Sequence, residues 1–328
     1  MSIDWPRFTE IVRSHDRFLL TSHIRPDCDA LGSELGMGGV LESLGKSVTI
    51  VNAQPTPPNL RFIDPQNRLK ALGVDIRPHE LWDFEVLMVL DTSAWAQLGA
   101  MAEVVRSTVA RKLILDHHVG EDDLGAELFK NPQAEATGRL VVEAAHHLGA
   151  RITPAMAGPL FAAIATDTGW FRFGSTTGTT LRYAAELIEA GAVPCEIFAG
   201  LYEQDSLPRL QLRGRILAHT KTDLDGRLVY TSALKADFDA TGALPSDTED
   251  AINLTLGVAG TEVAVIFVEQ PTGGFKLSFR SRTPRVDCNE LAKRFGGGGH
   301  KAAAGASIDL PWPEAETKVL DAVRNAMR

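Results

Sequence analysis

Cysteine is scarce in this chain, and the cysteines present suit neither a disulfide framework nor a thiolate metal site. Cys28, Cys195 and Cys288 form an odd set of three without the short spacing of metal-binding cysteines. We therefore expect a reducing compartment, the cytoplasm. Cys28 lies between two acidic residues, where a small side chain fitting a tight turn is a simpler interpretation than thiol chemistry.

Long apolar runs are also absent. No stretch reaches the roughly 18 apolar residues that a membrane span requires, so we expect no membrane partner. The first residues, Met1 to Asp4, lack the basic start and apolar stretch of a signal peptide. The 328 residues are 44% hydrophobic, which is enough for two ordinary cores, and they contain no internal repeat or low-complexity tract.

Positive charge is in short supply, since the net charge is −9. A protein that coats long nucleic acid carries a broad basic surface, so we expect no binding of long duplexes. The charge is uneven, because residues 1–205 hold 17 Lys and Arg against 27 Asp and Glu, and residues 206–328 hold 16 against 15. Residues 274–301 include seven basic and two acidic side chains. This local excess favours a small or short anionic partner.

Strand and helix signals alternate in the first half, which predicts an α/β protein with a parallel sheet. A helix that opens after Asp29, with residues 30–36, is rich in small residues and should pack closely against a neighbour. The second half predicts a smaller α/β domain with strands at 227–234, 262–270 and 275–282. We expect a first domain over 1–190, a helical linker over 191–218 and a second domain over 219–328.

Histidine and aspartate follow three of the apolar runs that predict strands. The carboxyl ends of parallel strands share one edge of a sheet, where ligands bind, so these side chains should meet in one pocket. The three segments are His23 to Asp29 after residues 18–20, Asp91 after residues 86–90, and Asp116-His117-His118 after residues 113–115.

Several carboxylates in one pocket predict a pair of divalent metal ions. Asp27, Asp29, Asp91 and Asp116 would repel one another if ionised and unpaired, and burying each charge would cost several kcal/mol. Imidazole and carboxylate together suit Mn²⁺, Fe²⁺, Zn²⁺ or Mg²⁺. Taken singly, an aspartate after a strand is usually a helix cap and a histidine a hydrogen-bond partner. Their joint placement at strand ends favours the metal interpretation.

The spacing suggests a role for each residue. Alternation in an extended turn would point Asp27 and Asp29 the same way, one toward each metal. Asp91 could bridge both ions, while one of the paired imidazoles ligates and the other faces substrate. Asp116 could fix the tautomer of an imidazole. Asp167 ends an apolar helix; alone it would be a turn residue, but with the other acidic motifs it completes a ligand set.

A glycine run at 296–299 is followed by His300 and Lys301. Glycine lets the backbone approach a ligand closely and offer N–H groups to phosphate oxygens, although a flexible linker is the alternative. Ser278 and Arg280 alternate on a predicted strand and so share a face. We expect these residues to form a substrate site.

Together these motifs resemble the DHH phosphoesterases, named for the sequence at 116–118. The second half is similar to the DHH-associated C-terminal domain, whose signature Gly-Gly-Gly-His stands at 297–300. Length and two-domain plan resemble the bacterial nanoRNase group, bifunctional oligoribonucleases that also dephosphorylate adenosine 3′,5′-bisphosphate. The resemblance implies an active site in a cleft between the two domains.

The resemblance also implies roles for individual residues. Two divalent ions are expected, Mn²⁺ first, with Mg²⁺ or another as alternatives. His23, Asp27 and Asp91 would hold one ion, and Asp29, Asp91, His117 and Asp167 the other. His118 would contact the scissile phosphate, so His118, Asp116 and Asp91 form the catalytic set. Substrate would bind Ser278, Arg280, Gly298, Gly299 and His300.

The function expected is hydrolysis of short oligoribonucleotides, of about two to five nucleotides, and of nucleoside bisphosphates. Alternatives that keep the same site are a phosphodiesterase of linear or cyclic dinucleotides, an inorganic pyrophosphatase and a processive single-strand exonuclease. The non-enzyme alternative is an inactive nucleotide sensor, which would have lost a ligand. A homodimer remains open.

Overall fold

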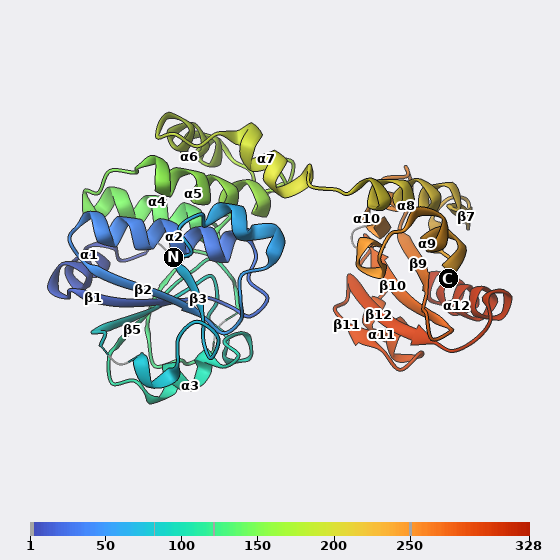
Figure 1. Cartoon of the computed structure of the whole chain (residues 1–328), viewed down its shortest axis with the longest axis horizontal. Coiled ribbons are helices and arrows are strands. Elements are labelled where there is room, and N and C mark those ends of the chain that lie inside the picture. Colours follow the sequence, from blue (N-terminus) through green and yellow to red (C-terminus); the bar gives the residue numbers. More distant parts are fainter. Residues whose placement is uncertain (1–2, 82, 121, 249–250) are drawn as a thin grey trace. The chain divides into compact units, whose positions relative to one another are not determined.

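The computed structural model describes residues 3–81, 83–120, 122–248 and 251–328. They divide into two compact units, residues 1–204 and 205–328 (Figure 1). The segment predicted as a linker is shared between them: α7 (Pro194–Tyr202) packs in the first unit, and α8 (Leu207–Ala218) packs on strands of the second. Among these described residues, no helix is long and apolar enough to cross a membrane.

The first unit is built on a six-stranded, wholly parallel sheet with the order β3-β2-β1-β4-β5-β6. This is the order of doubly wound sheets, in which the connections reverse direction between β1 and β4. The strands are β1 (Arg17–Thr21), β2 (Ser47–Asn52), β3 (Leu69–Ala71), β4 (Val86–Leu90), β5 (Arg111–Asp116) and β6 (Glu127–Lys130). The helices before α7 are α1 (Trp5–Ser14), α2 (Cys28–Ser43), α3 (Met101–Ser107), α4 (Thr137–Leu148), α5 (Pro154–Asp167) and α6 (Gly178–Glu189).

Both faces of this sheet are buried, which explains why its central strands are continuously apolar. Leu20 and Met88 pack with α2, α4 and α5, while Leu19 and Val89 pack with α3 on the other face. Figure 1 shows the same arrangement, with α2, α4 and α5 on one side of the sheet and α3 on the other. The predicted α/β class is thereby confirmed.

A glycine stripe lets α2 lie directly on α5. A Cβ atom added at Gly32 would come within 2.3 Å of the Pro159 carbonyl oxygen, and one at Gly36 within 2.4 Å of the Leu160 side chain. The close packing predicted for this helix is therefore present. It fixes the start of α2, which carries Asp29, against the helix that ends at Asp167.

The second unit is a smaller mixed sheet with the order β11-β12-β10-β9-β8-β7. Among the described strands of this sheet, only β8 and β9 pair in parallel. One core contains residues of α11 and α12, and a separate core contains residues of α8 and α10. The remaining elements are β7 (Lys221–Asp223), β8 (Leu228–Ala233), α9 (Lys235–Thr241), α10 (Ala251–Thr255), β9 (Val263–Glu269), β10 (Phe275–Ser281), α11 (Cys288–Lys293), β11 (Gly298–Gly299), β12 (Ala303–Ile308) and α12 (Trp312–Met327).

Candidate metal centre

The predicted histidines and aspartates meet where the sheet connections reverse direction. His23 follows β1, Asp91 follows β4 directly, and Asp116 is the last residue of β5. These three strands are neighbours in the sheet, so their carboxyl ends open into the same crevice. The crevice contains a pocket of about 820 Å³ lined by His23, Asp27, Asp91 and His118, among others.

One group of potential ligands consists of His23, Asp27 and Asp91. The Nδ1 atom of His23 donates to the Ile24 carbonyl at 2.8 Å, since a carbonyl can only accept. Its Nε2 atom consequently keeps a lone pair, and it lies 3.3 Å from Asp91 Oδ2 and 3.8 Å from Asp27 Oδ1. A ring held through one nitrogen with the other facing carboxylates is the usual arrangement of a metal-binding histidine.

A second group joins Asp29, His117 and Asp167. The His117 Nε2 atom lies 3.6 Å from Asp29 Oδ2 and 3.5 Å from Asp167 Oδ2. It also lies 3.5 Å from Asp91 Oδ1, so Asp91 borders both groups. The grouping is the one that the family resemblance implied, although ligation itself remains a prediction.

The environment of His117 fits a bound cation. Its Nδ1 atom donates to the Ala134 carbonyl at 3.2 Å, while Nε2 is buried without a hydrogen-bond partner among the described residues. A buried, unpaired nitrogen is costly unless something binds it. Three carboxylates within 3.6 Å of that nitrogen supply the negative charge that a divalent ion would neutralise.

Burial raises the pKa of the carboxyl groups in this cluster. The pKa of Asp167 rises to about 8 because of burial and then the charges of Asp29 and Asp27. The pKa of Asp91 is raised well above its usual value by burial and the same neighbouring charges. Burial also raises the pKa of Asp29, outweighing the neighbouring His117 ring and the hydrogen bonds that Asp29 accepts from the Gly138 and Thr137 backbone. Without a cation, the folded protein therefore retains protons here at neutral pH.

The start of α4 supports the cluster, a feature that the sequence interpretation missed. The backbone N–H groups of Thr137 and Gly138 donate to Asp29 at 2.7 and 2.8 Å, and the Thr137 hydroxyl donates to Asp91 Oδ1 at 3.0 Å. Small residues that open a helix are suited to anion binding at its N-terminus, and Thr-Gly at 137–138 was the available signal.

Asp27 and Asp29 reach the cluster differently from the extended turn that we expected. Asp27 is the N-cap of α2 and accepts from the backbone N–H groups of Asp29 and Ala30, whereas Asp29 lies in the first helical turn. The extended-turn prediction was therefore wrong, because Asp27 caps α2 and the helix begins at Cys28, between the two aspartates. Asp27 is exposed and Asp29 is fully buried, which separates them into the two groups.

Asp91 has a left-handed backbone with φ of 61°. Such a conformation costs about 1–3 kcal/mol in a residue other than glycine and persists where the surroundings enforce it. Here the Asp91 N–H group donates to the Leu115 carbonyl of the neighbouring strand at 3.1 Å. The turn places the carboxylate between His23 and His117.

His118 differs from the other two histidines in being half exposed. Its Nδ1 atom lies 2.8 Å from Asp116 Oδ1, and its backbone N–H group donates to the same oxygen at 3.0 Å. The hydrogen bond that His118 donates to Asp116 raises the pKa of His118, because it stabilises the imidazolium. Burial works to raise the pKa of Asp116, but its hydrogen bonds from His118 and Ser93 prevail and lower it. Asp116 is thus ionised behind His118, whose Nε2 atom is left for a group in the pocket.

Cys28 lies next to Asp27 and Asp29 in the sequence, but its thiol is unreactive. It is buried, and burial, followed by the nearby carboxylate charges, raises the pKa of its thiol to about 12. A thiol is unreactive as a nucleophile in that state. The interpretation of Cys28 as a small side chain that fits the turn is the better one.

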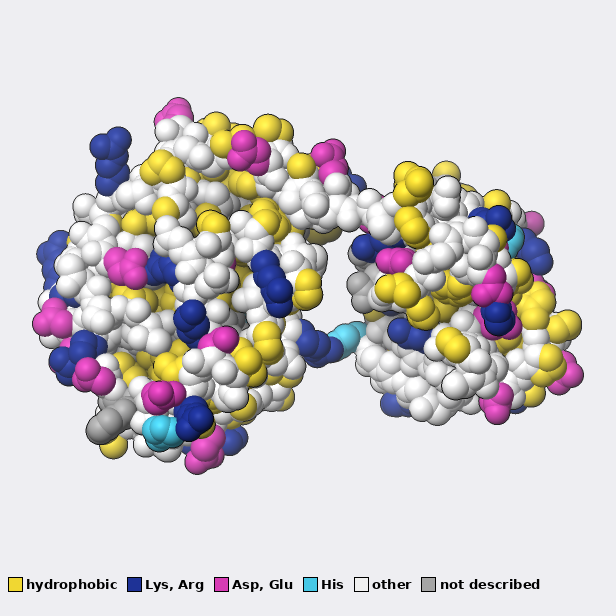
Figure 2. Space-filling view, viewed as in Figure 1, with side chains coloured by type: hydrophobic (Ala, Val, Ile, Leu, Met, Phe, Trp, Pro, Cys, Tyr) yellow, Lys and Arg dark blue, Asp and Glu magenta, His cyan; other side chains and the backbone are white. Residues whose placement is uncertain are grey.

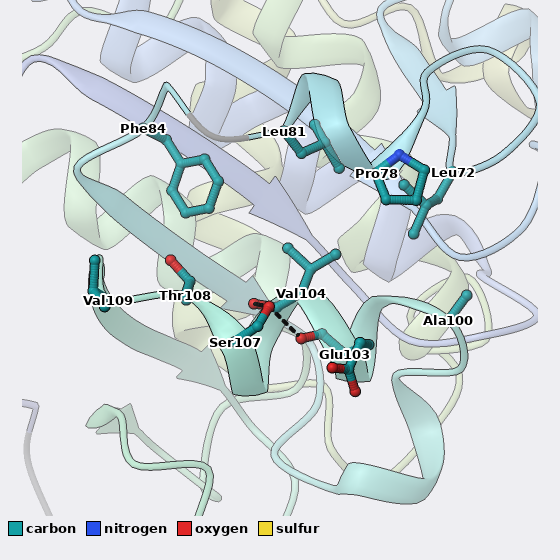
Figure 3. Close-up of a pocket in the computed structure, with 10 residues that line it drawn as sticks. All are labelled: Leu72, Pro78, Leu81, Phe84, Ala100, Glu103, Val104, Ser107, Thr108 and Val109. Carbon is teal, nitrogen blue, oxygen red and sulfur yellow. Dashed lines mark hydrogen bonds between the residues drawn. The ribbon is translucent and has the colours of Figure 1, made fainter.

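Another hollow of the first unit lies apart from the predicted site residues. It has a volume of about 380 Å³ and is mainly apolar, between α3 and the segment that carries Pro78 and Leu81. Figure 3 shows its ten lining side chains, with Glu103 the one charged group among them. It therefore lacks the ligands that the crevice provides.

The predicted substrate residues lie on two strands of the second unit that flank β12. Ser278 and Arg280 are on β10, and Gly298 and Gly299 form β11. Ser278 pairs with Gly305 of β12, which pairs with Gly298 on its other side, so these residues form one row across the sheet. His300 follows β11 directly and is exposed. The guanidinium of Arg280 donates to the carbonyl of the preceding residue, Phe279, at 3.2 Å.

The glycine run leads into the two-residue strand β11 (Gly298–Gly299) rather than forming a linker. A Cβ atom added at Gly297 would lie 2.1 Å from the Gly305 carbonyl oxygen, and Gly299 has φ of 150°. The Gly299 N–H group donates to Asn289 Oδ1 at 3.1 Å. Only glycine fits here because β12 approaches the run so closely. The sequence pattern predicted that the run is ordered but not that it lies against another strand.

We expect the metal-free protein to become less stable as pH rises from about 5.5 to about 8. The raised pKa of Asp167 means that the folded state keeps a proton that the unfolded state loses above about pH 4, so the free energy of unfolding falls across this window. The expected fall is about 1–3 kcal/mol, and Asp167→Asn should reduce it. Thermal unfolding in chelator at several pH values measures this.

Adding Mn²⁺ should raise the melting temperature more at pH 8 than at pH 5.5, because cations compete with protons for these carboxylates. Glu34→Gln is the control: Glu34 is buried outside the ligand groups and burial raises its pKa to about 8. The Glu34→Gln variant should reduce the pH dependence of the free energy of unfolding, yet its melting temperature should still rise when Mn²⁺ is added. An Asp167→Asn protein with unchanged pH dependence and metal gain would contradict the prediction.

Comparison with known proteins gives matches along both units. Residues 17–164 match the N-terminal domain of the DHH family, and residues 228–328 match the DHHA1 domain. The chain is 33% identical over 311 residues to the bifunctional oligoribonuclease and PAP phosphatase NrnA of Thermus thermophilus, covering 94% of the chain and 89% of that relative. Identity to the protein of the same name from Bacillus subtilis (strain 168) is 29% over 321 residues, covering 95% and 96%.

A solved structure shares the whole fold. It is titled as an exopolyphosphatase-related protein from Bacteroides fragilis and matches with a TM-score of 0.83 at 26% identity, covering 98% of this chain and 95% of that one. The predicted resemblance is confirmed by these findings. With two family models matched in order and a 33% identical relative matched over most of its length, the chain belongs to the DHH family.

Proposed function

We propose that this chain is a metal-dependent phosphoesterase that degrades short oligoribonucleotides to mononucleotides and removes a phosphate from adenosine 3′,5′-bisphosphate. The observation that carries the proposal is the crevice in which His23 and His117 turn free Nε2 atoms toward shared carboxylates. Relatives named as oligoribonuclease and PAP phosphatase, similar over nearly the full chain, support the substrate class.

We infer that two divalent ions, Mn²⁺ before Mg²⁺, occupy the two ligand groups. His23, Asp27 and Asp91 would hold one ion, and Asp29, Asp91, His117 and Asp167 the other. Such ions stabilise the charge that develops on the attacking and leaving oxygens in phosphoryl hydrolysis. Asp91 fixes the distance between the two groups because its two oxygens face different histidines.

The chain's own residues supply the remaining chemistry. His118, with its pKa raised by Asp116, presents Nε2–H to a phosphate oxygen and withdraws negative charge from it. Asp116 keeps the imidazole in that tautomer and orientation. In the second unit, Ser278, Arg280 and the backbone of Gly298 and Gly299, with His300, would bind the sugar or another phosphate of the nucleotide.

The proposal is tested by a turnover panel with Mn²⁺. It contains adenosine 3′,5′-bisphosphate, RNA and DNA of two to about 20 nucleotides, linear and cyclic dinucleotides, and pyrophosphate. Hydrolysis of the bisphosphate and the shortest RNA is the expected result. A preference for cyclic dinucleotides or pyrophosphate would reassign the substrate, and no turnover of any member would favour a nucleotide sensor.

Efficiency should fall steeply as RNA lengthens from about five to about 20 nucleotides, because the acidic first unit repels a long backbone. Residues 1–205 carry 17 basic and 27 acidic side chains, and on the face shown in Figure 2 the two kinds are interspersed without a continuous basic surface. Added salt should partly relieve the penalty on long strands. Efficiency that stays flat or rises with length would instead favour a processive exonuclease.

Replacing Arg280 or His300 with alanine should lower kcat/KM for the bisphosphate about 10-fold or more, as expected for the loss of a charge-assisted contact of about 1.5–3 kcal/mol. A small generic phosphodiester, which has no second anchoring group, should be hydrolysed at nearly the normal rate. Lys318→Ala, an exposed cation on α12, is the control. Equal losses on both substrates would mean that these residues support folding or the metal centre.

A further inference from the structure

A buried lysine lies behind the Asp116–His118 pair. Lys130 is the last residue of β6 and pairs in register with Asp116, the last residue of β5. Only 8% of its side chain is exposed. Its Nζ atom donates to Ser93 Oγ at 2.6 Å and to the Gly120 carbonyl at 2.7 Å, and it lies 3.3 Å from Asp116 Oδ2. Lysine is seldom buried unless paired, so this placement calls for an explanation.

The two oxygens of Asp116 face different sides. Oδ1 accepts from the ring and the backbone N–H group of His118. Oδ2 accepts from the Ser93 hydroxyl at 2.9 Å and faces Lys130. Because Oδ2 is held from behind, the carboxylate cannot rotate, and Oδ1 stays directed at His118.

A count of hydrogen atoms shows why Ser93 alone is insufficient. The Ser93 hydroxyl lies within hydrogen-bond distance of two acceptors, Asp116 Oδ2 and the Gly120 carbonyl at 2.7 Å, but it has one hydrogen to donate. The Lys130 ammonium has three N–H donors and reaches Gly120, Ser93 and Asp116. With Lys130 present, the carboxylate and the carbonyl no longer compete for one proton.

The same contacts hold the loop that follows His118. Gly120 is fixed by Lys130 and Ser93, while the Asp122 N–H group donates to the Ser93 carbonyl at 2.8 Å. The Asp122 side chain in turn accepts from the Trp95 N–H group at 2.8 Å. These hydrogen bonds hold the loop after β5, which carries His118, against the loop after β4, which carries Asp91.

We propose that Lys130, together with Ser93, is a positioning residue for catalysis: it locks Asp116 and the loop through Gly120, so that His118 meets the substrate phosphate in one orientation. The proposal rests on the proposed function for its consequence in turnover. Its structural content, the control of the His118 ring by Lys130, is independent of which substrate is cleaved.

A double-mutant cycle tests the proposal. Lys130→Met, of similar length but without donors, should lower kcat for adenosine 3′,5′-bisphosphate about 10- to 100-fold with little change in KM or in bound Mn²⁺. In a His118→Ala background the same change should cost less than about 2-fold, because the residue through which it acts is gone. Lys130→Arg should restore part of kcat. Lys112→Met is the control, since the Lys112 Nζ atom donates to the Val105 carbonyl, at 3.5 Å, away from the Asp116–His118 pair.

A spectroscopic measurement separates this proposal from the proposed function. In ¹⁵N-labelled protein, the His118 ring nitrogens should report a single Nδ1–H orientation in the wild type and an altered or averaged signal in Lys130→Met. If the wild type hydrolyses nothing in the panel, the proposed function fails, whereas the ring signal still decides the role of Lys130. If Lys130→Met does not fold, Ser93→Ala takes its place in the cycle. Equal losses in both backgrounds, loss of metal, or an unchanged His118 signal would overturn the proposal.

Discussion

Replacing Asp91 with asparagine is expected to abolish turnover, by about 10³-fold or more, and to weaken metal binding in both ligand groups. Asp91 is 2% exposed, with Oδ2 3.3 Å from His23 Nε2 and Oδ1 3.5 Å from His117 Nε2. The amide keeps the shape of the side chain but removes the charge that two cations would share. Metal content of the purified variant and kcat/KM for adenosine 3′,5′-bisphosphate measure the two effects.

A buried aspartate outside the crevice provides the control for this experiment. Asp64 is 7% exposed and accepts from the backbone N–H groups of Arg68 and Leu69. Asp64→Asn should reduce thermal stability while leaving bound metal and kcat at wild-type values. If Asp91→Asn retained two metals at full occupancy, Asp91 would not border both sites and the bridging role would be wrong.

The adjacent histidines are expected to respond differently to alanine. His118→Ala should lower kcat about 10²- to 10⁴-fold while the bound metal is retained, because His118 acts on the substrate phosphate. His117→Ala should lower turnover and metal content together, since its buried Nε2 atom lies within 3.6 Å of three carboxylates. Metal analysis and steady-state kinetics on both variants distinguish the two roles.

The opposite outcome is equally informative. If His118→Ala lost metal and His117→Ala kept it, the two imidazoles would have been assigned in the wrong order. The exposure of the rings supports His118 as the substrate contact: 55% of the His118 side chain is exposed and 15% of the His117 side chain. A substrate ligand must be reachable from solvent, whereas a metal ligand can be enclosed.

Most residues of the candidate metal centre could be selected from local sequence, because a buried parallel strand is visible as a short apolar run. His23, Asp91 and Asp116 each stand at or just after such a run, and parallel strands align those ends. Helix 154–167 was equally clear from its apolar content. The helix after β4 is less apparent from local sequence, since Gly99, with φ of 52°, separates a short turn at 95–97 from α3.

Strands that depend on a partner were harder to predict. β12 is made of alanine, glycine and serine before its final isoleucine, residues of low strand propensity. It is a strand because β10 pairs with it along residues 303–308. The short strands β3 and β6 were not predicted either, since each is an edge strand with one neighbour. In all three cases the sheet, rather than the local sequence, provides the hydrogen bonds.

The sequence by itself determined the α/β class, the two-part organisation and the set of histidines and aspartates, since these follow from apolar periodicity and from residues adjacent in the chain. Only the tertiary structure decided which ring nitrogen His117 leaves free, because its tautomer is set by the carbonyl of Ala134 in another segment. It alone decided that the start of α4 supports Asp29 and that Lys130 stands behind Asp116. Such contacts join residues up to 109 positions apart, and their partners become neighbours only after the strands and helices have packed.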